Sequence, residues 1–253
     1  EQKACSTCSP EAPVVLEVKH LNAGKEVKDV SFNLRKGEIL GFAGLMGAGR
    51  TEVVRALYGA DPSQTGEIYL NGKKIRIKTP EQAVKNGICY LSEDRKRYGL
   101  MLDKSITENT TISSVEDFIT AGIINDAKMK KDSAEFNAKL RTKTPSMDQL
   151  LKNLSGGNQQ KVIIARWLMK NSDIFIFDEP TRGIDVGAKS EMYTLMEELV
   201  QQGKSVIMIS SELAEVQRLS DRVIVMCEGR ITGELDIADA TQEEIMKYAT
   251  MRE

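Results

Sequence analysis

The segment from Leu151 to Asp185 constrains the fold of this chain most strongly, because three chemically different elements follow one another in it. Ser155, Gly156 and Gly157 stand directly before good helix formers, which predicts a helix capped by Ser155. The free N–H groups and the positive end of such a helix attract phosphate. The wholly apolar run from Ile174 to Phe177 is typical of a central parallel strand that is covered on both faces.

Two carboxylates, Asp178 and Glu179, directly follow this apolar run. In open parallel sheets, ligands bind at the carboxyl ends of the strands. Paired carboxylates at that position can divide the work on a phosphoryl group, because one can hold a water of Mg²⁺ while the other orients the attacking water. The segment therefore predicts a site for a phosphate-containing ligand.

The order of LSGGNQQ, an apolar strand closed by DEP, and GID resembles the signature motif, Walker B strand and D-loop of ATP-binding cassette (ABC) ATPases. Each motif alone is an ordinary glycine turn or strand end, whereas the ordered triplet is specific. The resemblance implies an α/β P-loop NTPase of the ABC ATPase type, with an antiparallel β subdomain and an inserted α-helical subdomain. It also implies ATP and Mg²⁺ as cofactors.

A second phosphate-binding pattern lies earlier in the chain, where a strand from Ile39 to Ala43 precedes GLMGAGRTE and a helix from about Gly49 to Tyr58. The glycines let backbone N–H groups approach phosphate, and Thr51 is placed to offer its hydroxyl to Mg²⁺ together with Asp178. The residues expected to bind ATP here are Gly44, Leu45, Met46, Gly47, Ala48, Gly49, Arg50, Thr51 and Glu52.

Three residues depart from the family pattern. Arg50 replaces the P-loop lysine, and its wide planar guanidinium differs from the compact ammonium group of lysine. Glu93 stands where the family has glutamine, which adds negative charge beside the triphosphate. Ser211 replaces the switch histidine, and its hydroxyl can bind phosphate but offers no imidazole charge. The resemblance thus implies a weakened nucleotide site, in which Glu179 and Ser211 are the candidate catalytic residues.

The signature, by contrast, matches the family pattern. ABC cassettes pair head to tail, and each ATP lies between the Walker motifs of one cassette and the signature of the other. The resemblance implies that Ser155 and Gly157 clamp the γ-phosphate of the partner's ATP. The residues expected to contribute to nucleotide binding from this part of the chain are Leu154, Ser155, Gly156, Gly157 and Asp185.

Further motifs narrow the resemblance within the family. The stretch from Val14 to Glu253 resembles the C-terminal cassette of double-cassette ATPases from simple-sugar importers of the ribose, galactose and xylose type. The motifs that carry this resemblance are GLMGAGRTE, SEDRKR, TPS, LSGGNQQKV, DEPTRGIDVGAK and SSELAEV. This implies ATP-driven monosaccharide import at the cytoplasmic face of the cell membrane. The implied partners are an N-terminal cassette, as part of the same polypeptide or as a dimer mate, transmembrane permease subunits and, indirectly, a periplasmic or extracellular sugar-binding protein.

Composition agrees with a globular domain. The chain has 253 residues, of which 41% are apolar and 28% are charged. A formal charge of −2 provides no basic field, so no nucleic-acid partner is expected. No apolar run approaches the roughly 20 residues that span a bilayer, and no secretory leader is visible. The single C-x-x-C pair, Cys5 and Cys8, lacks the second ligand pair that a zinc site requires.

The expected organisation is a linker or tail over residues 1–13 and a nucleotide-binding domain over residues 14–253, with the helical subdomain at about 94–153. Alternation from Val14 to Leu34 predicts two antiparallel edge strands, and Asn71-Gly72 predicts a hairpin. Residues 105–153 lack strand patterning and include a predicted helix over 126–141. His20, the sole histidine, is expected to be an ordinary surface residue.

Two other functions stay open from the sequence. One is a soluble ABC ATPase that acts on ribosomes or DNA, although such a protein is expected to carry basic extensions or a long insertion, and neither is visible. The other is a regulatory module that binds nucleotide without hydrolysing it.

Overall fold

The structure is a computed structural model that describes residues 2–63 and 65–251. The chain divides into two compact units. The first unit comprises residues 1–90, 173–180 and 196–253, and the second comprises residues 91–172 and 181–195. Each unit has a hydrophobic cluster of its own.

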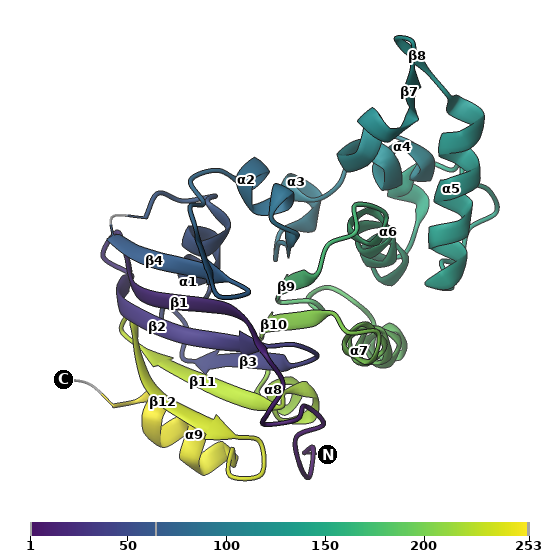
Figure 1. The fold of residues 1–253 in the computed structure, drawn as a ribbon. Helices are drawn as coiled ribbons and strands as arrows, with labels where there is room; N and C mark the ends of the chain where they lie inside the picture. The colour runs from purple at the N-terminus through teal and green to yellow at the C-terminus, as the bar shows by residue number, and fades with distance from the viewer. Residues whose placement is uncertain (1, 64, 252–253) are drawn as a thin grey trace. The chain divides into compact units, whose positions relative to one another are not determined.

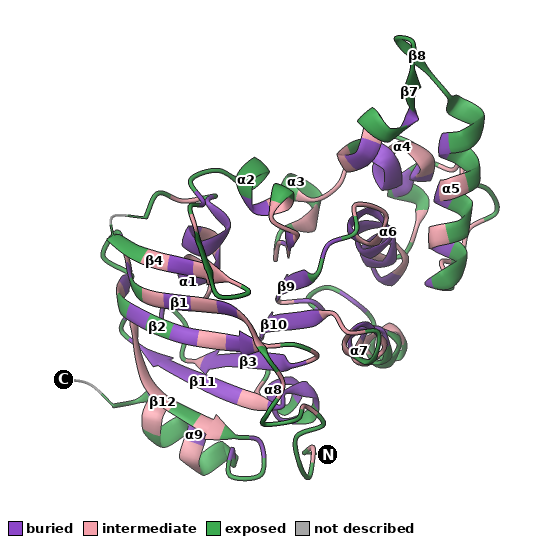
Figure 2. Ribbon diagram, in the orientation of Figure 1, coloured by how far each residue is buried: buried purple, intermediate pink, exposed green. Residues whose placement is uncertain are grey.

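A six-stranded sheet forms the centre of the first unit, with the strand order β12-β11-β3-β10-β9-β6 (Figure 1). β3, β9, β10 and β11 pair in parallel, and β12 is antiparallel to β11. All residues of β9 and β10 are buried (Figure 2), which confirms the prediction for the apolar run before Asp178. The strands are β3 (Ile39–Gly44), β6 (Ile88–Leu91), β9 (Ile174–Asp178), β10 (Ser205–Ile209), β11 (Arg222–Cys227) and β12 (Arg230–Asp236).

The parallel pairing places three chain segments at one edge of this sheet. Because β3, β9 and β10 run in the same direction, their carboxyl ends lie side by side. The glycine-rich loop follows β3, Asp178 ends β9, and Ser210 follows β10. We call this edge, with these three segments, the carboxyl edge.

A second, antiparallel sheet has the order β2-β1-β4-β5. β1 therefore lies between β2 and β4, and the prediction that both early strands are edge strands is wrong for β1. Asn71 and Gly72 both have positive φ at the predicted hairpin, as a tight β-turn of this kind requires. The strands are β1 (Val14–Ala23), β2 (Val27–Arg35), β4 (Thr65–Leu70) and β5 (Lys73–Ile75).

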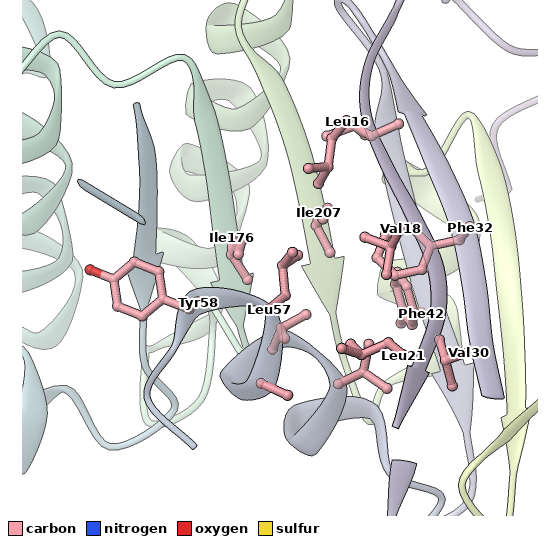
Figure 3. Close-up of a cluster of buried hydrophobic side chains, with 14 of the residues drawn as sticks. Leu16, Val18, Leu21, Val30, Phe32, Phe42, Leu57, Tyr58, Ile176 and Ile207 are labelled. Carbon is pink, nitrogen blue, oxygen red and sulfur yellow. The ribbon is translucent and has the colours of Figure 1, made fainter. Parts of the chain in front are cut away.

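The main core contains side chains from both sheets and from α1. Figure 3 shows Leu16 and Val18 of β1 in the same cluster as Leu57 of α1 and Ile207 of β10. Phe32 and Phe42 meet edge to face, with ring centroids 5.2 Å apart. This geometry adds about 0.5–1.5 kcal/mol to the hydrophobic burial of two aromatic rings.

Five helices cover the strands or connect them in the described part of the first unit. Thr79 caps α2, and Thr241 caps α9. α8 was not predicted, because its seven residues are too few to show a helical period. α7 begins in residues of the second unit and ends in the first. The helices are α1 (Arg50–Tyr58), α2 (Pro80–Lys85), α7 (Val186–Gln201), α8 (Leu213–Leu219) and α9 (Gln242–Ala249).

The second unit is mainly helical and packs around Ile106, Leu151 and Val162. The predicted absence of strands is wrong, because β7 and β8 form a hairpin around Ala121 and Gly122. Strands of two residues are too short to show alternation in a sequence. Its elements are α3 (Arg95–Tyr98), α4 (Ile106–Thr111), the 3₁₀ helices η1 (Ile112–Phe118) and η2 (Leu151–Asn153), β7 (Ile119–Thr120), β8 (Ile123–Ile124), α5 (Asp126–Lys139) and α6 (Gly156–Met169).

Residues 2–13 contain neither helix nor strand, but they are hydrogen-bonded to the first unit. Lys3 Nζ and the Thr7 backbone N–H each lie 2.7 Å from Asp221 Oδ1. Asp221 is 1% exposed, and its Oδ2 accepts the Ile39 N–H at 2.9 Å. The N-terminal segment is thus held by a buried carboxylate next to β3.

His20 is exposed and pairs with Asp29, as expected of a surface residue. No helix in the described ranges is long and apolar enough to cross a bilayer.

Gly41 in the middle of β3 gives the first prediction. An added Cβ would lie 2.1 Å from Ser220 Oγ and 3.1 Å from Val216 Cγ1. Gly41→Ala should therefore lower the free energy of unfolding by about 1–3 kcal/mol through overpacking, measured by urea denaturation. The combination with Ser220→Ala should recover part of this loss relative to Ser220→Ala alone. Unchanged stability of Gly41→Ala would contradict the packing described here.

Candidate functional site

The glycine-rich loop joins β3 to α1 at the carboxyl edge. Gly49 caps α1 with φ 98°, and a Cβ at this position would lie 2.4 Å from the Glu26 carbonyl oxygen. Only glycine fits such a close approach at positive φ. Leu45 and Met46 are exposed at the tip, with Met46 99% exposed. The loop therefore presents backbone and the first turn of α1, which includes Glu52, toward an approaching anion.

A buried carboxylate lies beside the start of α1. Asp178 is 1% exposed, and its Oδ1 accepts a hydrogen bond from Thr51 Oγ1 at 3.1 Å. Its Oδ2 accepts a shorter bond, 2.6 Å, from Tyr90 Oη. Burial raises the pKa of Asp178, while the two hydroxyl donors oppose that rise. The hydroxyl of Thr51 and the carboxylate of Asp178 are hard oxygen ligands, so the pair fits Mg²⁺.

Tyr90 was not among the predicted site residues. In the sequence it belongs to the apolar strand ICYL, and nothing local distinguishes it from a core aromatic residue. Its contact with Asp178 arises from tertiary structure and is visible only in the fold.

Arg50 lies at the same edge. Its Nη1 donates to the Ser210 carbonyl oxygen at 2.6 Å. Burial lowers the pKa of the guanidinium, whereas the charges of Glu179 and Asp178 raise it. The P-loop cation is therefore next to the carboxylates and is held by a backbone carbonyl.

Glu179 and Ser211 meet directly. Ser211 Oγ donates to Glu179 Oε2 at 3.0 Å, and the Glu179 N–H donates to the Ile209 carbonyl oxygen at 2.9 Å. Glu179 has φ 51°, a left-handed conformation that costs a residue with a Cβ about 1–2 kcal/mol. Strained backbone of this kind is concentrated at functional sites.

The structure thus brings Arg50, Thr51, Asp178, Glu179 and Ser211 together at the carboxyl edge. The predicted residues 44–49 of the glycine-rich loop and Glu52 belong to the first unit as well. The remaining predicted site residues belong to the second unit, and they are Glu93, Leu154, Ser155, Gly156, Gly157 and Asp185.

The signature segment forms the predicted capped helix. Ser155 is exposed and caps α6, and its Oγ accepts hydrogen bonds from the Asn158 N–H at 3.4 Å and from Asn158 Nδ2 at 2.9 Å. Gly157 is buried, and a Cβ there would lie 2.9 Å from Ala188 Cβ. Asp185 is exposed, and its Oδ1 accepts the Ala188 N–H at 3.0 Å. Leu154, half-buried, ends η2 immediately before this cap.

Two charged residues lie close to the signature and the D-loop within the second unit. Glu93 forms an ion pair with Arg182. Arg95 Nη1 donates to the Arg182 carbonyl oxygen at 2.8 Å, and its Nη2 lies 2.7 Å from the position of a Cβ on Gly156. Arg95 was not among the predicted site residues, because nothing local distinguishes it from the other basic residues of the run from Asp94 to Arg97.

Comparisons with known proteins agree with these motifs. A family model described as ABC transporter matches residues 27–182. A Burkholderia ambifaria protein, provisionally named ribose/galactose/methyl galactoside import ATP-binding protein 3, is 56% identical over 241 residues, which are 95% of this chain and 47% of that protein. The ribose import ATP-binding protein RbsA of Clostridium tetani is 50% identical over 236 residues, which are 93% of this chain and 47% of that protein. The chain spans about half the length of the curated relatives it matches.

A solved structure has the same fold. The ATP-binding cassette MJ1267 of an ABC transporter, in its ADP conformation, matches with a TM-score of 0.76 at 21% identity, over 94% of this chain and 95% of that chain. The predicted fold class is therefore confirmed.

The burial of Asp178 gives a stability prediction. Because its pKa is raised in the native state, ionisation disfavours folding at any pH above the pKa of the unfolded chain, about 3.9. Asp178→Asn should therefore raise the free energy of unfolding of the nucleotide-free chain at pH 7 by about 1 kcal/mol, and its Tm by about 2–4 °C. The gain should disappear as the pH falls below about 4, where both states are protonated.

Thermal unfolding of Asp178→Asn and of the unaltered chain at pH 7 and pH 4 measures this effect. Asp173→Asn is a suitable control, because the Asp173 side chain is 75% exposed. A lower Tm for Asp178→Asn at pH 7 would show that the carboxylate stabilises the apo fold instead.

Proposed function

The chain belongs to the ABC transporter family, and from that premise we propose that it is an ATP-binding component of an importer for simple sugars. The observation that carries this proposal is the carboxyl edge, where a phosphate-binding loop, a buried aspartate and an adjacent glutamate converge. The sugar class is supported by the names of relatives that are 50–56% identical.

The chain's own residues would act as follows. Backbone N–H groups of the loop and of the first turn of α1 bind the phosphates of ATP. Thr51 would hold Mg²⁺ through its hydroxyl and Asp178 through a water, and the ion would supply positive charge beside the phosphates. Glu179 accepts a proton from the attacking water, and the hydroxyl of Ser211 positions the carboxylate of Glu179.

We infer that this nucleotide site is weakened. Arg50 already donates through Nη1 to the Ser210 carbonyl oxygen, so this bond competes with phosphate for the guanidinium. Ser211 offers a hydroxyl that is already bonded to Glu179, and it carries no imidazole. The contact with Ser210 holds the Arg50 charge on a backbone carbonyl, and Ser211 adds no positive charge, at a place where a phosphoryl-transfer transition state gains negative charge.

The signature, in contrast, would serve a second cassette. Ser155 is exposed at the start of a fourteen-residue helix, so its side chain and this positive helix end can be approached by a phosphate that another molecule brings. The match to about half of each relative supports a second cassette as the partner, and we propose that this partner is the N-terminal cassette, in the same polypeptide or as a dimer mate. We propose that the pair acts at the cytoplasmic face of the membrane on permease subunits, which receive sugar from a binding protein.

A regulatory module that binds ATP without hydrolysing it is the second candidate. The contacts of Arg50 and Ser211 with neighbouring protein groups favour it. A soluble ABC ATPase acting on ribosomes or DNA has less support, because the chain carries a formal charge of −2.

ATP turnover by the isolated chain tests the weakened site. The purified chain should bind Mg-ATP but hydrolyse it very slowly. Arg50→Lys combined with Ser211→His should raise turnover by at least about tenfold, because a compact cation and an imidazole are restored. Rapid turnover by the unaltered monomer at micromolar protein would refute the proposal. Intact binding without any recovery in the double variant would instead favour the regulatory module.

The role of the signature can be tested with a partner cassette that has a P-loop lysine and a switch histidine. Ser155→Ala should lower ATP turnover by the mixed pair about tenfold, because the clamp on the partner's γ-phosphate is lost. Binding of Mg-ATP to the altered chain alone should not change. Ser146→Ala, at another exposed serine of the second unit, is the matched control. Equal turnover with both variants would contradict a shared site.

A further inference from the structure

Tyr90 contacts the carboxyl edge from the side of β6. Its hydroxyl donates to Asp178 Oδ2 at 2.6 Å, which is shorter than the 3.1 Å bond from Thr51 to Oδ1. Its ring packs on Tyr58 of α1, with ring centroids 5.4 Å apart and an interplanar angle of 37°. Tyr58 is only 7% exposed, so the ring of Tyr90 rests against a buried aromatic residue (Figure 3 shows Tyr58 at the rim of the core cluster).

The two oxygens of Asp178 therefore have different partners. Oδ1 is bonded to Thr51, whose hydroxyl must turn toward a cation when one binds. Oδ2 is bonded to Tyr90, and this bond can persist while Oδ1 changes its partner. An ionised carboxylate accepts only, so the tyrosine hydroxyl is the donor. The bond from Tyr90 fixes the plane of the carboxylate before any ligand arrives.

We propose that Tyr90 is a positioning residue that presents Asp178 Oδ1 to the Mg²⁺ of the bound nucleotide. This inference rests on the proposed function, because it assumes that Thr51 and Asp178 hold the cation. Mg²⁺ demands near-octahedral geometry, so a carboxylate that is free to rotate is a poorer ligand. Hydrogen-bond partners behind a metal ligand commonly change metal affinity by 10–100-fold.

The ring of Tyr90 adds a second constraint. α1 begins at the glycine-rich loop, and its last residue, Tyr58, packs on Tyr90. The Tyr90 side chain is thus hydrogen-bonded to Asp178, the carboxylate proposed to hold the metal. Its ring packs on α1, the helix whose first turn is proposed to bind the phosphates. The hydroxyl and the ring can be separated by mutation, because phenylalanine keeps the ring and removes only the donor.

The experiment measures Mg²⁺ affinity rather than turnover. N-methylanthraniloyl-ATP is bound to the full chain, and its fluorescence is followed while Mg²⁺ is added. Tyr90→Phe should raise the Mg²⁺ concentration for half-saturation about tenfold. Binding of the same probe in EDTA should be unchanged, because no metal then depends on Asp178. Tyr69→Phe is the matched control, since the Tyr69 hydroxyl donates to Glu67 on β4, in the antiparallel sheet.

A double-variant comparison separates positioning from packing. In Asp178→Asn the carboxylate is absent, so adding Tyr90→Phe should cause no further change in Mg²⁺ dependence. Thermal unfolding of Tyr90→Phe shows whether the ring still packs.

Three results would overturn the proposal. If the unaltered chain binds no probe with or without Mg²⁺, the proposed function fails and this inference fails with it. If the chain binds and depends on Mg²⁺, but Tyr90→Phe behaves like Tyr69→Phe, only the role of Tyr90 fails. If Tyr90→Phe weakens binding equally in Mg²⁺ and in EDTA, Tyr90 supports the fold and does not position the carboxylate.

Discussion

The arrangement of the carboxyl edge depends on one carboxylate that is buried at the end of an apolar strand and requires hydrogen-bond donors around it. Asp178 ends a strand whose residues are all buried, and such a charge is costly unless donors surround it. Thr51 and Tyr90 supply those donors from two different elements. The parallel pairing of β9 with β10, and of β10 with β3, brings the start of α1 within reach, and β6 with Tyr90 lies next to β9 in the sheet. The ionised carboxylate of Asp178 therefore lowers the stability of the nucleotide-free fold, although the proposed Mg²⁺ binding depends on it.

Much of this arrangement is legible in the sequence, because it depends on local signals. The glycine-rich loop after β3, the cap at Ser155 and the hairpin at Asn71 follow from residue type and spacing. β7 and β8, with two residues each, are too short to produce a period. The place of β1 inside its sheet depends on pairing with β4, which no local pattern specifies.

The residues that depart from the family pattern have specific partners in the fold. Arg50 is bonded to a carbonyl after β10, and Ser211 to the glutamate that follows β9. The family pattern marks both as departures, but it does not show that Arg50 Nη1 and Ser211 Oγ already donate to protein atoms. The contact of Tyr90 with the carboxylate of Asp178 is likewise invisible in the sequence, where Tyr90 looks like an ordinary core aromatic residue. The partners of Arg50, Ser211 and Tyr90 at the carboxyl edge are set by tertiary contacts, which a sequence motif does not specify.

The attachment of the N-terminal segment has a structural consequence. Asp221 binds Lys3 and Thr7 through one oxygen and the first N–H of β3 through the other. β3 has six residues, so it spans about 20 Å before it reaches the glycine-rich loop. The N-terminal segment and the glycine-rich loop are thus attached to the two ends of the same strand, so residues that precede the first sheet are only one strand away from the carboxyl edge.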